Sequence, residues 1–257
     1  MSSAPRARSR IGTLIRHEAL LLARAPGPVV GYTVMPVLLM TVLRPMLERV
    51  AALDLTTGMG GTAQAAAGMA VMFSLFAVKV VGAGFLQERT WHTWDRLGVS
   101  PARTSELLIS KAMPMLIVLL VQQAIIIGFA MAVFGLRPAA AWWPLALVAI
   151  AWTGCILILG TAAATLVQSP AQLSLAGDIA AVLTSILGGA LVPAELLPGW
   201  LRAVGPLSPG YWAMRSYQAA LVDPGASSLM GALAGLGCFI ALGVVLSASL
   251  ARRQTDG

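Results

Sequence analysis

Two charged side chains lie inside long apolar stretches of this sequence, where a charge is costly and therefore informative. Lys79 falls within residues 63–86, and Asp178 falls within residues 173–193. A charge deep in a membrane-spanning helix costs at least about 2.5–3.5 kcal/mol on insertion scales, so such a group usually faces protein or water. A lysine can also reach the membrane surface with its long stem, whereas an aspartate is too short to do so. Asp178 therefore gives the stronger indication of a polar surface inside the membrane.

Asp178 shares one helical face with other small and polar residues. Ser174 precedes it by four residues, and Ala181, Ser185 and Gly188 follow at spacings of three and four. Residues at these spacings lie one above the other on a helix. A small, polar face of this kind suits close helix packing or a hydrated cavity, and the sequence leaves both interpretations open.

The polar segment at residues 87–111 combines charged and aromatic residues. On a helix, Trp91, Trp94 and Leu97 fall on one side and the charges fall largely on the other. Tryptophan prefers the membrane–water interface, so we expect this helix to lie flat beneath the bilayer. The polar residues that it offers to a cytoplasmic partner are Glu88, Arg89, Thr93, Asp95 and Arg96. An ordinary solvated loop with aromatic anchors fits the same pattern.

Apolar stretches occupy most of the chain. Of its 257 residues, 58% are hydrophobic and 11% are charged, whereas about a quarter of an ordinary soluble domain is charged. A transmembrane helix needs about 20 mostly apolar residues. Six stretches meet this requirement, at residues 27–47, 63–86, 112–134, 141–167, 173–193 and 228–250. The predicted fold class is an all-α polytopic membrane protein with one transmembrane domain over residues 1–257.

The basic residues predict the orientation of these spans. If the N-terminus is inside, 11 lysines and arginines flank the cytoplasmic ends and 5 flank the outer ends. An excess of lysine and arginine is typical of cytoplasmic loops. Because the number of spans is even, both termini are then predicted to lie in the cytoplasm. The net charge of +7 is therefore not an indication of nucleic-acid binding. Residues 9–25 are predicted to form an amphipathic helix on the membrane surface, with a simple basic tail as the alternative.

The segment at residues 194–221 is too interrupted to cross the membrane. Prolines divide it into pieces that predict a short helix near 198–204 and a second near 210–221. Trp200, Tyr211, Trp212 and Tyr217 suit the outer headgroup level. The residues that we single out here are Pro193, Glu195, Pro198, Trp200 and Pro209. Both an outer lid over a substrate path and a cap that only seals the bundle are compatible with this pattern.

The chain carries no G-x-x-x-x-G-K-[ST] sequence, and Lys79 and Lys111 are its only lysines. It therefore lacks the common phosphate-binding loop for ATP. No ligand spacing for a metal ion occurs, and no catalytic constellation lies at membrane depth. We expect neither enzymatic activity nor a cofactor in this chain.

Two motifs together resemble the ABC-2 type transporter permeases, in particular the branch that exports drugs and antibiotics. The first runs from Glu88-Arg89 through Arg96-Leu97, Ser100-Pro101 and Glu106-Leu107-Leu108 to Lys111. The second extends from Leu187 through Pro193 and Leu197-Pro198-Gly199-Trp200 to Pro209. Trp91 departs from the family pattern, which has a small residue near this position.

The resemblance implies a mechanism and a set of partners. Two copies of this chain would pair with two copies of a separate ABC ATPase subunit, which would hold ATP and Mg. The segment at 87–111 would contain the coupling helix that docks on this ATPase, and the outer segment would form short re-entrant helices. The complex would move a hydrophobic or amphipathic compound, such as a drug, antibiotic or lipid-like molecule, out through the plasma membrane. The alternative is a secondary transporter driven by an ion gradient.

The resemblance also places the buried charges. In this family the second and fifth spans line the central pathway between the two copies. We therefore expect Lys79, Asp178, Ser174 and Ser185 to line that pathway, with Lys79 and Asp178 as neighbours at its inner end. Nearby Met69, Met72, Phe73 and Phe76 could form an adaptable drug surface, although such residues more often pack in a core.

Overall fold

The computed structural model describes residues 26–53, 59–90, 104–138, 141–222 and 226–255. Within these ranges the chain is helical and contains no strand. The predicted amphipathic helix at 9–25 and residues 91–103 of the predicted coupling loop lie outside the described residues.

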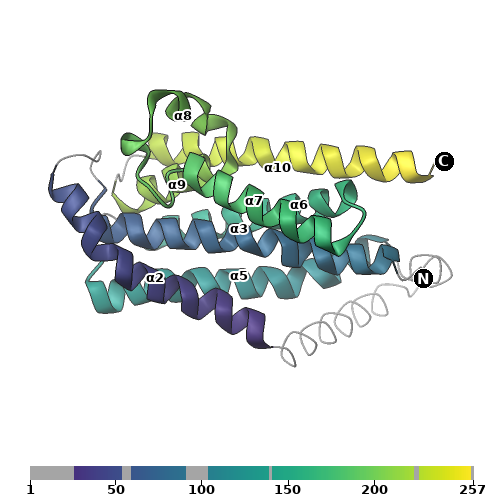
Figure 1. The fold of residues 1–257 in the computed structure, drawn as a ribbon, viewed down its shortest axis with the longest axis horizontal. Coiled ribbons are helices and arrows are strands. Elements are labelled where there is room, and N and C mark those ends of the chain that lie inside the picture. The colour runs from purple at the N-terminus through teal and green to yellow at the C-terminus, as the bar shows by residue number, and fades with distance from the viewer. Residues whose placement is uncertain (1–25, 54–58, 91–103, 139–140, 223–225, 256–257) are drawn as a thin grey trace, which may run out of the picture.

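In the described part of the chain, six long helices form the bundle, whose arrangement is drawn in Figure 1. They are α2 (Pro26–Ala52), α3 (Gly61–Thr90), α5 (Thr104–Phe134), α6 (Trp143–Leu166), α7 (Pro170–Leu187) and α10 (Ala226–Thr255). Each contains a stretch that is long and apolar enough to cross a membrane. The prediction of an all-α polytopic protein with six spans is confirmed.

Helix α3 is the central helix of the bundle. Of the residues in its membrane-crossing part, 78% are buried, against 17% in α2 and 17% in α7. It contacts α2, α5, α6, α7 and the shorter helix α9 (Pro209–Leu221). The run of glycine and alanine at the start of α3 allows these neighbours to approach closely. Met69, Met72 and Phe73 are buried in this core, so they are packing residues and not a drug surface.

Helix α7 differs from the predicted span 173–193 at both ends. Ser169 caps its start, because the Ser169 hydroxyl accepts a hydrogen bond from the Gln172 amide, and Pro170 occupies the first turn. The helix ends at Leu187, where Gly189 adopts a φ of 76°. The Ala190 amide bonds back to the Ser185 carbonyl, as in a Schellman motif. Residues 188–193 therefore form a turn, not the last part of a span.

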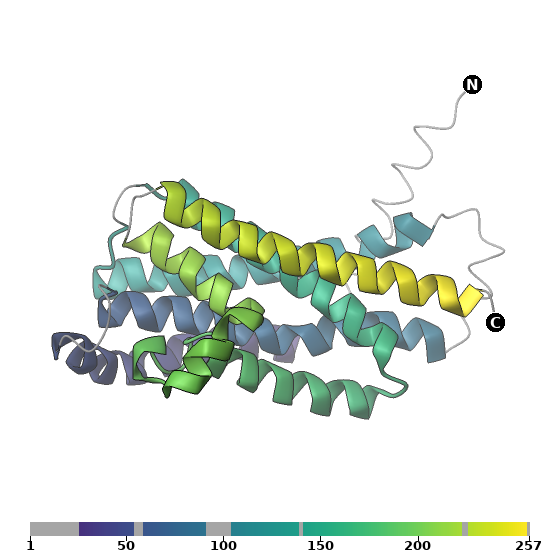
Figure 2. The same ribbon diagram turned by 90° about the horizontal axis from the view of Figure 1, so that it is seen from above.

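The outer segment folds into short pieces at one end of the bundle. These are η1 (Ala194–Leu196), α8 (Gly199–Val204), η2 (Gly205–Leu207) and α9. Figures 1 and 2 show them at the end opposite the C-terminal ends of α3 and α10. Helix α9 packs against α3, α6 and α10. Tyr217 is 1% exposed, so this ring packs inside the bundle and not on its outer surface.

Candidate functional site

The structure brings Lys79 and Asp178 together. The Lys79 Nζ donates to the Asp178 Oδ1 at 2.5 Å, which joins α3 to α7. The side chains remain 25% and 41% exposed, so the pair lies on a surface of the single subunit. In a membrane-spanning bundle, charged side chains at such a surface are expected to face protein or water rather than lipid.

The other predicted pathway residues do not share one environment. Ser174 is exposed one turn before Asp178. Ser185 is 1% exposed, and its hydroxyl donates to the Ala181 carbonyl of its own helix. The structure thus places Ser174 near the ion pair and separates Ser185 from that surface.

The structure describes only some of the predicted coupling residues. Glu88 and Arg89 belong to the last turn of α3, which continues to Thr90. The apolar part of this helix ends at Ala83, so the helix extends roughly 10 Å further at 1.5 Å per residue. Thr93, Asp95 and Arg96 lie outside the described residues.

The turn that leads from α7 into the outer segment is attached directly to α3. The Gln64 Nε2 donates to the Gly189 carbonyl at 2.7 Å. One turn later, a Cβ on Gly68 would lie only 2.1 Å from the Ala190 carbonyl oxygen. The backbone of the turn after α7 therefore rests on α3 at a place where only glycine fits.

The predicted outer residues take distinct positions in this segment. Pro193 and Pro198 precede η1 and α8, and Pro209 begins α9. Glu195 lies in η1 and lines a cavity of about 230 Å³ together with Gln64, Tyr211 and Arg215. Trp200 is 69% exposed, which fits the interfacial position that the sequence predicted.

The family model for ABC-2 type transporters matches residues 9–222. The match covers the end of α3, the Lys79–Asp178 pair and the outer segment. The chain belongs to the ABC-2 type transporter family. It is a multi-pass membrane subunit of a transporter that works with an ATP-binding subunit. No curated protein matches the chain significantly.

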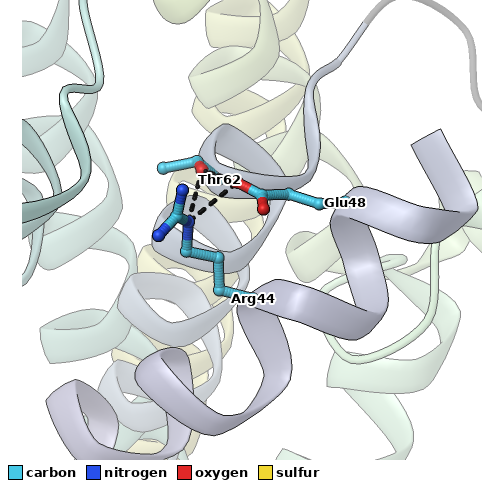
Figure 3. Close-up of polar contacts among 3 residues, drawn as sticks. All are labelled: Arg44, Glu48 and Thr62. Carbon is cyan, nitrogen blue, oxygen red and sulfur yellow. Dashed lines mark hydrogen bonds and ion pairs between the residues drawn. The ribbon is translucent and has the colours of Figure 1, made fainter. Parts of the chain in front are cut away.

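Sequence reasoning missed a polar cluster in the ABC-2 subunit, drawn in Figure 3. The Arg44 Nε donates to the Glu48 Oε1 at 2.8 Å and to the Thr62 Oγ1 at 3.1 Å. The Thr62 hydroxyl in turn donates to Glu48, and the Arg44 guanidinium lies 4.5 Å from the centre of the Phe134 ring. This cluster joins α2, α3 and α5. The spacing of Arg44 and Glu48, four residues apart on one helix, could have indicated the ion pair.

A second missed network is buried inside the ABC-2 subunit. The Tyr217 hydroxyl donates to the Gln123 Oε1, and the Gln123 Nε2 donates to the Thr153 hydroxyl at 2.7 Å. Burial raises the pKa of the Tyr217 hydroxyl above its ordinary value, so this group remains a donor. The network fastens α9 to α5 and α6. A glutamine inside the apolar stretch 112–134 was the available signal.

Proposed function

We propose that this ABC-2 subunit is the membrane half of an exporter for hydrophobic or amphipathic compounds. Two copies of the subunit pair with two copies of a separate ATPase in the plasma membrane, and the N-terminus and C-terminus are cytoplasmic. ATP and Mg bind to the ATPase, and this chain performs no catalysis itself.

The continuity of α3 is the observation that supports the proposal. One helix of 30 residues carries Glu88 and Arg89 at one end, Lys79 in between and the contacts to the outer segment at the other end. An α-helix is stiff over this length, since every interior residue adds a hydrogen bond to its ladder. A force applied at Glu88 and Arg89 therefore acts on the whole membrane domain.

The proposed transport cycle uses three sites along α3. The ATPase docks on Glu88 and Arg89, with support from Thr93, Asp95 and Arg96, and its closure on ATP moves the end of α3. This movement changes the surface between α3 and α7, where Lys79, Asp178 and Ser174 line the path of the substrate. The same movement shifts the outer segment, which acts as the outer lid.

The matched variants Arg89→Ala and Arg49→Ala test the coupling site. Each removes one cation, but Arg49 lies near the opposite end of the bundle and is exposed. We expect Arg89→Ala, like Glu88→Ala, to reduce ATP-dependent export at least about tenfold, which corresponds to the loss of about 1.4 kcal/mol of coupling. Arg49→Ala should export like the wild type. Membrane insertion, measured by protease protection, should be equal in all three variants. Unchanged export in both Glu88→Ala and Arg89→Ala would remove this site from the mechanism.

A further inference from the structure

The Lys79 ammonium lies between a carboxylate and an aromatic ring. Its Nζ is 2.5 Å from the Asp178 Oδ1 and 5.9 Å from the centre of the Phe76 ring. An acidic group beside an aromatic ring is an arrangement by which proteins bind organic cations, because the face of the ring is electron-rich.

The base of the Lys79 side chain is tightly packed, whereas its ammonium head group is free to move. A Cβ on Gly177 would lie 3.1 Å from the Lys79 Cβ, so the base of the lysine packs closely against the backbone of α7. The ammonium is at the far end of a flexible stem, and the pair is partly exposed at the subunit surface. The head group can therefore leave Asp178 without displacement of the backbone.

We propose that Lys79 and Asp178 form a self-occupied cation site, in which a lipophilic cation replaces the Lys79 ammonium between Asp178 and Phe76. This inference rests on the proposed export function and narrows the cargo to amphipathic organic cations. An anionic cargo would have to approach Lys79 beside the electron-rich face of Phe76, which disfavours a negative charge.

Two probes of nearly equal size and shape but opposite charge, tetraphenylphosphonium and tetraphenylborate, test this site. Binding of each is measured at equilibrium to the full-length chain in lipid nanodiscs without nucleotide. We expect saturable binding of the phosphonium that weakens about tenfold in Asp178→Asn, because the anchoring charge is lost. In Lys79→Met the phosphonium should bind about tenfold more tightly, because the internal competitor is gone.

The control variant is Arg49→Gln, which removes a cation near the outer end of α2. It should change the affinity for neither the phosphonium nor the borate. Lys79→Met leaves Asp178 without its partner and could fail to fold. Phe76→Leu therefore serves as a second variant, because it keeps the ion pair and removes only the ring. It should weaken phosphonium binding about threefold.

If the ion pair has only a structural role, the wild type, Asp178→Asn and Phe76→Leu should bind the phosphonium equally. Either this result, or tighter binding of the borate than of the phosphonium to the wild type, would overturn the proposal. Since the binding assay contains no ATPase, its failure would leave the coupling experiment on Arg89 unaffected. If export were unchanged in Glu88→Ala and Arg89→Ala while the phosphonium still bound as expected, the proposed coupling to the ATPase would be refuted and the cation site would stand.

Discussion

Replacement of Gly68 with alanine should lift the outer segment from α3. The added Cβ would lie 2.1 Å from the Ala190 carbonyl oxygen, whereas carbon and oxygen atoms in contact are about 3.3 Å apart. The two backbones must therefore separate by about 1.2 Å, the difference between these distances. Insertion of a methyl group into a packed site typically costs about 1–3 kcal/mol. Here the obstacle is backbone, which cannot rotate away as a side chain can.

Gly128→Ala is the matched control for this substitution. Gly128 also lies inside a membrane-spanning helix, but a Cβ there meets no atom within 4 Å. Both variants gain the same intrinsic helix preference, about 1 kcal/mol, so this gain cancels in the comparison. Gly68→Ala should therefore be less stable than Gly128→Ala by about 1–3 kcal/mol.

Thermal unfolding of the two purified variants in one detergent measures this difference, and export assays in cells accompany it. We expect Gly68→Ala to unfold at a lower temperature and to export less than Gly128→Ala. If Gly68→Ala were as stable and as active as its control, the contact between α3 and the outer segment would not have the role assigned to it.

Two further predictions concern the turn before the outer segment and the last helix of that segment. Gly189→Ala should destabilise the subunit by about 1 kcal/mol, because the φ of 76° at this position strains any residue with a Cβ. The comparison variant is Gly31→Ala, whose site is open. Equal unfolding temperatures of the two variants would contradict this prediction. Tyr217→Phe leaves the Gln123 carbonyl oxygen without its buried donor and should cost about 1–3 kcal/mol. An unchanged unfolding temperature in Tyr217→Phe would contradict a stabilising role for this hydrogen bond.

The six spans could be predicted because hydropathy is a local property. A helix in lipid must satisfy its backbone internally and cover about 30 Å of hydrocarbon, so the length and composition of each stretch reveal it. Lys79 and Asp178 could be paired in advance because few charges lie inside the spans and the family resemblance placed their helices side by side. The end of α7 was harder to predict, since residues 188–193 are as apolar as the helix before them. The backbone at Gly189, and not hydropathy, ends that helix.

Tertiary partners account for what the sequence did not reveal. Tyr217 looks like an interfacial aromatic residue, but its position is determined by Gln123, 94 residues earlier in the chain. In the sequence, Arg44 is one of the five basic residues that flank the predicted outer ends of the spans, whereas in the fold it joins α2 to Thr62 of α3. The central position of α3 follows from its glycines and alanines, yet only the packed structure shows that Gly68 receives the turn at Ala190.

The claim that α3 transmits movement from the ATPase to the outer segment can be measured with one fluorescent label. With Cys155 and Cys238 changed to alanine, Trp200→Cys places an environment-sensitive dye at an exposed position of α8. ATP and Mg, trapped with vanadate, should shift its emission in the assembled transporter. Glu88→Ala should abolish the shift while the subunits stay assembled. A shift that persists in Glu88→Ala, or no shift in a complex that still exports, would contradict the account.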